Sequence, residues 1–146
     1  ARGQGAASTF LFQTLAGQPI VIWGDGSVVR DYIHVCDLVD ALLALADVPA
    51  ERLSGADAAA VLNIGSGEGI SLNGIIAVLR DDLGLTPVVD YQPGRAFDVP
   101  VSVLDITRAH RVLGWTPRLS FAQGYALMLK DVRGPDPLFS TLLDRP

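Results

Sequence analysis

Short strand-like segments alternate with longer helix-like segments along this chain, and the alternation limits the fold more than any other feature. Alternating strands and helices are typical of α/β proteins, in which helices connect the strands of a sheet. We therefore predict an α/β fold. The expected strands are residues 18–24, 61–65 and 87–93, of which 61–65 should be buried. Residues 30–35 should be extended. The expected helices are residues 7–17, 36–48, 71–84, 105–114 and 120–133.

Polar residues and glycines mark where these helices should begin and end. Serine and threonine oxygens accept hydrogen bonds from the free N–H groups of a first helical turn, so Ser8 or Thr9 and, later, Ser71 are the expected caps. Glycine commonly ends helices because it adopts positive φ without strain, which suits Gly84 and Gly114.

The composition excludes several functional classes. The chain has 146 residues, 49% of them apolar, and a net charge of −5, so no basic surface for nucleic acid is expected. No apolar run approaches the roughly 20 residues that span a bilayer, so we expect no membrane segment. The single cysteine, Cys36, excludes an internal disulfide, suits a reducing compartment and is expected in the core or a linker. Two histidines and one cysteine without ligand spacing argue against a zinc site.

Two glycine-rich segments superficially match a dinucleotide-binding motif. In "VLNIGSGEGIS" (residues 61–71) and "GDGSVV" (residues 24–29), two glycines have the spacing G-x-G. The third glycine of G-x-G-x-x-G lets helix and strand pack closely, but Ile70 and Val29 stand in its place. Both segments are therefore predicted to be tight turns.

Two arginines in separate loops raise the question of an anionic ligand. The planar guanidinium binds phosphate with two parallel hydrogen bonds, so Arg30 and Arg95 could hold a pyrophosphate together. Asp98, three residues after Arg95, could accept hydrogen bonds from a ribose diol. The alternative is that Arg30 pairs with Asp31 or Asp37, and Arg95 with Asp98, in surface ion pairs that contribute less than about 1 kcal/mol.

Other polar and aromatic residues have structural interpretations. His34 is expected to be packed or hydrogen-bonded and not a catalytic base. Asn63 is expected either near an active site or as the cap of a turn. Trp115 follows the end of a helix and should anchor the core.

Three blocks in order resemble a known family. "GQPIVIWGDGSVVRDYIHVCDLVDAL", "LNIGSGEGISL" and "PGRAFDVPVSVLDITRAHRVLGWTP" together resemble the C-terminal half of an extended short-chain dehydrogenase/reductase. Within that superfamily they are most similar to the NAD-dependent sugar-nucleotide epimerases and dehydratases, especially the UDP-glucose 4-epimerases. The resemblance implies a Rossmann-type fold in which residues 1–133 form the substrate-binding region, with 61–65 returning to the Rossmann sheet, and residues 134–146 form a tail.

The resemblance also implies roles for individual residues. The arginine of the family's G-x-x-x-R-D-Y motif contacts a nucleotide diphosphate, and that position is Arg30. The R-x-x-D loop supplies a second diphosphate contact and a ribose contact, at the positions of Arg95 and Asp98. Asp31 is expected to orient the loop or to pair locally. The implied ligand is a UDP-sugar.

The family's cofactor and catalytic motifs are missing from these 146 residues. The G-x-x-G-x-x-G motif for NAD is absent, and no tyrosine is followed four residues later by the lysine of Y-x-x-x-K. We therefore expect a fragment or a truncated gene product of an epimerase. Alone it should be inactive and bind no cofactor, and the missing N-terminal part of the epimerase should bind NAD. The alternatives are a 4,6-dehydratase or decarboxylase of the same superfamily, or a non-catalytic nucleotide-sugar binding module or remnant.

A chain that lacks part of its Rossmann sheet would expose apolar surface. Such a surface favours self-association, so a homo-oligomer is expected. The expected compartment is the cytoplasm.

Overall fold

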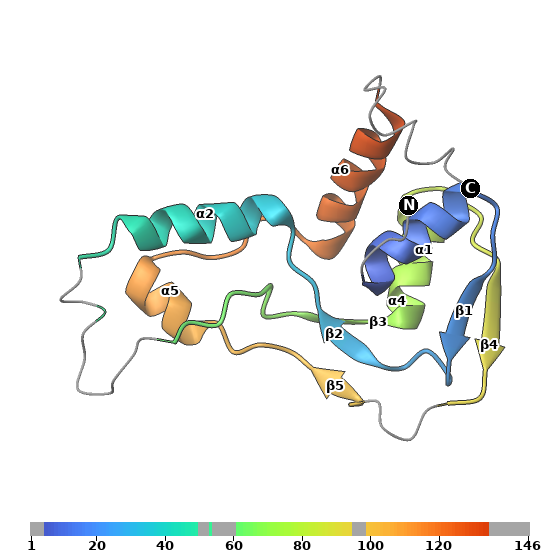
Figure 1. Cartoon of the computed structure of the whole chain (residues 1–146), viewed down its shortest axis with the longest axis horizontal. Coiled ribbons are helices and arrows are strands. Elements are labelled where there is room, and N and C mark those ends of the chain that lie inside the picture. Colours follow the sequence, from blue (N-terminus) through green and yellow to red (C-terminus); the bar gives the residue numbers. More distant parts are fainter. Residues whose placement is uncertain (1–4, 50–52, 54–60, 95–98, 135–146) are drawn as a thin grey trace. The chain divides into compact units, whose positions relative to one another are not determined.

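The computed structural model of the chain describes residues 5–49, 53, 61–94 and 99–134 (Figure 1). Its helices are α1 (Ala6–Leu15), α2 (Val35–Ala46), α4 (Leu72–Ala77), α5 (Thr107–Leu113) and α6 (Phe121–Arg133). Its strands are β1 (Ile20–Trp23), β2 (Val29–Asp31), β3 (Gly69–Ser71), β4 (Val89–Gln92) and β5 (Val101–Ser102). Helices lie between strands along the sequence, and the pairs β1–β4 and β2–β5 are parallel, so the predicted α/β class is confirmed.

The described residues form two compact units that interleave along the sequence. The first holds residues 5–28, 71–94, 99–100 and 125–134, and the second holds residues 29–49, 53, 61–70 and 101–124. None of the described helices is long and apolar enough to cross a membrane.

The first unit is built on β1 and β4, which pair in parallel with Ile20 opposite Val89 (Figure 1). Side chains alternate across β1, so Ile20 and Ile22 are buried while Val21 and Trp23 are exposed. Helix α1 packs against β1 and α4. The buried apolar residues of this unit come from both helices, β1, the turn after α4 and α6: Phe10, Leu11, Ile20, Ile22, Ile75, Ile76, Leu79, Tyr125, Leu129 and Val132.

The ends of the helices show where the capping predictions were right. Ser71 precedes α4 and its hydroxyl accepts a hydrogen bond from the backbone N–H of Gly74 at 3.0 Å, as predicted. Helix α4 continues as a π-helical turn over Val78–Asp82, and Gly84 follows with φ of 62°. Gly114 ends α5 in the left-handed conformation, with φ of 67°.

The predicted cap of the first helix was wrong. Helix α1 starts after Gly5, with no side-chain cap, so Ser8 and Thr9 lie inside its first turns. Gly5 has φ of 82° and ψ of 160°, a conformation open to glycine, and its carbonyl accepts a hydrogen bond from the N–H of Thr9 at 3.2 Å.

The second unit contains a three-stranded sheet in the order β3-β2-β5, in which β2 is the central strand. Strands β2 and β5 are parallel, with Arg30 opposite Ser102. Helix α2 packs on α5, and Trp115 is buried with Ala41 and Ala109 between them, which confirms Trp115 as a core anchor. Partly buried apolar residues complete this cluster: Ile33, Ala44, Leu62, Ile64 and Leu113.

Residues 61–65 do not form the buried strand that the sequence predicted. Val61 is 70% exposed, whereas Leu62 and Ile64 are partly buried against the Trp115 cluster. The alternating burial is that of an extended segment, but a strand needs a neighbour for its backbone groups, and no described strand pairs with this segment. The strand of this region lies later, at β3.

Candidate functional site

Arg30 lies on β2, the central strand of the second unit's sheet. Its side chain is partly buried, and its Nη1 donates a hydrogen bond to the carbonyl oxygen of Val29 at 2.7 Å. Burial raises the pKa of the nearby Tyr32 phenol, and the positive charge of Arg30 acts in the opposite direction. The Tyr32 phenol is therefore neutral at physiological pH, and its ring packs edge-on against Phe121 with centroids 5.5 Å apart.

Asp31, the next residue, joins three separate segments through its carboxylate. One oxygen, Oδ1, accepts hydrogen bonds from the N–H of Ser66 at 2.7 Å and from its hydroxyl at 2.6 Å. The other, Oδ2, accepts from the N–H groups of Gly67 at 3.1 Å and Leu104 at 3.2 Å. These partners lie 35 to 73 residues away, so Asp31 fixes the loop at residues 66–67 to β2 and does not pair locally through these bonds.

Glycines in residues 65–69 make room for this arrangement. A Cβ atom on Gly65 would lie 2.7 Å from Asp31 Oδ2, and one on Gly69 would lie 2.5 Å from Val29 Cγ1. Gly67 has φ of 72°, as a tight turn requires. The predicted turn is confirmed. The space beside these glycines is filled by protein side chains, so this segment does not fit the pyrophosphate of a dinucleotide.

The second glycine segment forms a turn after β1 in the first unit. The carboxylate of Asp25 accepts a hydrogen bond from the N–H of Ser27 at 2.9 Å, and hydrogen bonds from Ser27 lower the pKa of Asp25. Asn73 on α4 holds this turn: its Nδ2 donates to the carbonyl of Asp25 at 2.8 Å, and its Oδ1 accepts from the Tyr91 hydroxyl at 2.8 Å. The tight turn predicted here is confirmed too.

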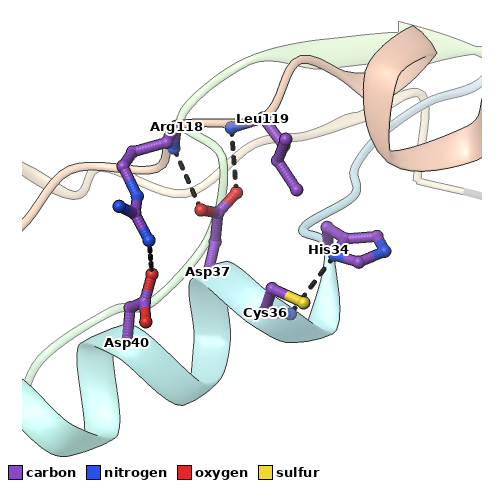
Figure 2. Close-up of polar contacts among 6 residues, drawn as sticks. All are labelled: His34, Cys36, Asp37, Asp40, Arg118 and Leu119. Atoms are coloured by element: carbon purple, nitrogen blue, oxygen red, sulfur yellow. Dashed lines mark hydrogen bonds and ion pairs between the residues drawn. The ribbon is translucent and has the colours of Figure 1, made fainter. Parts of the chain in front are cut away.

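Asp37 is a buried carboxylate at the start of α2. From the sequence it was expected only near the start of a helix and as one alternative partner of Arg30. Its side chain is 1% exposed, and its two oxygens accept hydrogen bonds from the N–H groups of Arg118 at 3.0 Å and Leu119 at 3.1 Å (Figure 2). Buried carboxylates are rare unless such donors satisfy them. An aspartate in the first turn of an apolar helix was the available signal, but nothing in the sequence located its partners 81 and 82 residues away.

The other residues around α2 follow the sequence predictions in part (Figure 2). His34 is hydrogen-bonded, as predicted, because its Nδ1 accepts from the N–H of Cys36 at 3.2 Å and so caps the helix. Cys36 itself is exposed on the first turn of α2, so a core position for it was wrong. Asn63, on the segment before β3, donates from its Nδ2 to the carbonyl of Asp105 at 3.2 Å, and its expected place near an active site stays a prediction.

Of the three predicted ligand-binding residues, the structure places Arg30. Arg95 and Asp98 lie outside the described residues. Within the described part of the chain, no three histidine, cysteine or acidic residues gather in a way that could hold a metal ion.

Comparison with known proteins identifies relatives of one kind. Residues 2–65 match the sequence model of the NAD dependent epimerase/dehydratase family. A UDP-glucose 4-epimerase of Mycolicibacterium smegmatis is 35% identical over 123 residues, which are 84% of this chain and 37% of that protein. UDP-glucuronic acid decarboxylase 2 of Arabidopsis thaliana is 29% identical over 126 residues, 86% of this chain and 26% of that protein.

Solved structures agree with these sequence matches. MoeE5 in complex with UDP-glucuronic acid and NAD superposes with a TM-score of 0.77 at 35% identity, over 89% of this chain and 42% of that one. The UDP-glucose 4-epimerase of Thermotoga maritima, solved with UDP-glucose, superposes with a TM-score of 0.73 at 36% identity. The superposition covers 88% of this chain and 39% of that one.

The match covers most of this chain but a minority of each relative, since the chain spans between about a quarter and two fifths of their lengths. Its α/β architecture corresponds to part of the Rossmann-type fold of these enzymes. The sequence blocks, the family match over residues 2–65 and the superpositions agree, and the chain is similar to the NAD-dependent epimerases/dehydratases of the extended short-chain dehydrogenase/reductase type.

Proposed function

We propose that this chain is the nucleotide-sugar binding part of an NAD-dependent sugar-nucleotide 4-epimerase of the UDP-glucose/UDP-galactose type. In this proposal Arg30 and Arg95 bind the diphosphate, and Asp98 accepts hydrogen bonds from the ribose. NAD is bound by a glycine-rich motif outside these 146 residues, and the catalytic Tyr-x-x-x-Lys lies outside them as well.

The observation that carries the proposal is the placement of Arg30. Its strand is the middle one of three, and the neighbouring Asp31 is tied by four hydrogen bonds. Because the backbone that carries Arg30 is already fixed, binding an anion needs to order only the arginine side chain, which favours affinity. The solved relatives that bind UDP-glucuronic acid and UDP-glucose support the same ligand class.

The proposed role of this chain is to bind and orient the substrate. The guanidinium groups of Arg30 and Arg95 would hold the diphosphate while the sugar reacts. A fixed nucleotide keeps the sugar close to the catalytic groups and so lowers the entropic part of the barrier.

A decarboxylase acting on UDP-glucuronic acid is the second candidate. Two Arabidopsis thaliana UDP-glucuronic acid decarboxylases match 86% of this chain at 29% identity. Both candidates need the same diphosphate contacts, so Arg30 does not separate them. The two candidates are separated by incubating the intact protein with UDP-glucose and with UDP-glucuronic acid and identifying the products by mass and NMR. UDP-galactose from UDP-glucose supports the epimerase, and loss of carbon dioxide supports the decarboxylase.

Calorimetric titration of the intact protein with UDP tests the binding role. Hydrogen bonds to charged groups contribute about 1.5–3 kcal/mol, so Arg30→Ala should weaken UDP binding about tenfold to a hundredfold. Arg30→Lys should restore affinity only partly, because lysine keeps the charge but cannot form two parallel hydrogen bonds.

Arg80→Ala is the matched control for this experiment. Arg80 is 62% exposed and forms an ion pair with Asp81 at 2.7 Å, so its loss removes the same charge without touching β2. It should leave UDP affinity unchanged. If Arg30→Ala also leaves the affinity unchanged, Arg30 is not a ligand-binding residue.

A further inference from the structure

We propose that Asp31 is the positioning residue for Arg30, and that it sets UDP affinity without touching the ligand. This inference rests on the proposed binding role of Arg30. Asp31 would act by fixing how β2 is rotated about its own axis, and therefore which way the neighbouring arginine points.

The hydrogen bonds of Asp31 make it an anchor between segments far apart in the sequence. Three backbone N–H groups and one hydroxyl converge on one carboxylate, from the loop at residues 66–67 and from Leu104. Charge-assisted hydrogen bonds of this kind are about twice as strong as neutral ones. The strand end that carries Asp31 therefore cannot rotate or slip without losing several strong interactions.

Rotation of the strand matters because consecutive side chains of a strand point to opposite faces of the sheet. Arg30 and Asp31 are consecutive residues of β2. While Asp31 faces the loop at residues 66–67, Arg30 must face the other way. A shift by one residue would exchange the two, so the anchor also fixes which face of the sheet presents the positive charge.

The glycine at position 65 gives this anchor a second, independent support. A Cβ atom there would lie 2.7 Å from Asp31 Oδ2 and 3.0 Å from Leu104 Cδ1. Even the smallest added side chain would push the carboxylate from its donors. Gly65→Ala should therefore reproduce the effect of changing Asp31 itself.

The test is calorimetric titration of the intact protein with UDP, comparing Asp31→Asn with Asp37→Asn. Each carboxylate oxygen of Asp31 accepts two of the four hydrogen bonds. In Asp31→Asn an NH₂ group replaces one of these oxygens, so two donors face a group that cannot accept from them, whichever way the amide is turned. UDP binding should weaken about tenfold, which corresponds to about 1.4 kcal/mol. Asp37 is a matched control because it is also a carboxylate that accepts two distant backbone N–H groups, but from Arg118 and Leu119. Asp37→Asn should lower the melting temperature and leave UDP affinity within about twofold of the wild type.

The double variant Arg30→Ala/Asp31→Asn separates positioning from general destabilisation. If Asp31 acts through Arg30, the double variant should bind UDP no more weakly than Arg30→Ala alone. Uridine, which has no diphosphate, should bind wild type and Asp31→Asn equally.

Each outcome has one interpretation. Unchanged UDP affinity in Asp31→Asn, with weakened affinity in Arg30→Ala, overturns the positioning role alone. Unchanged affinity in Arg30→Ala overturns the proposed binding role on which it rests. Equal losses of UDP affinity in Asp31→Asn and Asp37→Asn, or additive losses in the double variant, assign Asp31 to stability only and also overturn the inference.

Discussion

Gly26 shows how much of the chain's local structure depends on single residues without a side chain. It has φ of 76°, and a Cβ atom on it would lie 2.6 Å from Cγ of Asn73, with the Oδ1 of Asn73 closer still. Asn73 cannot move freely, because it is hydrogen-bonded to Asp25 and Tyr91. An alanine here therefore meets both backbone strain and an immobile neighbour.

We expect Gly26→Ala to lower the free energy of unfolding by about 2–5 kcal/mol. About 1–2 kcal/mol comes from the left-handed backbone, and displaced hydrogen bonds of Asn73 add about 0.5–1.5 kcal/mol each. Gly17 is the control, since its φ is 64° and nothing lies within 4 Å of the added Cβ. Urea unfolding should show a loss of only about 1–2 kcal/mol in Gly17→Ala. Equal losses in the two variants would contradict the contact with Asn73.

At the scale of elements, α2 has two different faces. Asp37 and Ala41 are buried in the second unit, whereas five large apolar side chains are exposed along the helix. This apolar stripe of α2 follows helical spacing and consists of Val35, Leu38, Val39, Leu42 and Leu43. Contiguous exposed apolar surface of this kind is uncommon on monomers.

We expect the 146-residue chain to self-associate through the apolar stripe of α2. Leu42, 54% exposed, lies in the stripe, so Leu42→Lys should shift the mass measured by light scattering toward the monomer value of 15.4 kDa. Leu127→Lys is the helical control, because Leu127 is 39% exposed on α6 and outside the stripe. A wild-type chain that stays monomeric at high concentration would count against this expectation.

How far the elements could be predicted depends on whether their signals are local. Ser71 and Gly114 act within one turn of the chain, and both were read correctly from the sequence. Residues 61–65 were misread because alternating apolar residues show an extended backbone but not whether another strand lies beside it. The partners of Asp37 were missed for the same reason, since contacts over 81 residues leave no local pattern.

At the scale of the whole molecule, the sequence blocks pointed to the same kind of relatives that the comparisons found, and they suggested the ligand class that we propose. Arg30 was selected by its motif, and the structure adds the carboxylate of Asp31 that holds its strand. The four donors to that carboxylate come from residues 66, 67 and 104, and only folding brings them together. Resemblance could therefore suggest a candidate site residue, but not the contacts that hold its strand.

The most direct test of the account is a crystal structure of the intact protein with bound UDP. Nitrogen atoms of both Arg30 and Arg95 should lie about 2.7–3.2 Å from diphosphate oxygens, the normal range for such hydrogen bonds. Asp98 should accept a hydrogen bond from the ribose, and Asp31 should keep its bonds to Ser66, Gly67 and Leu104. A diphosphate bound away from Arg30 and Arg95 would contradict the central claim that these two arginines hold the nucleotide.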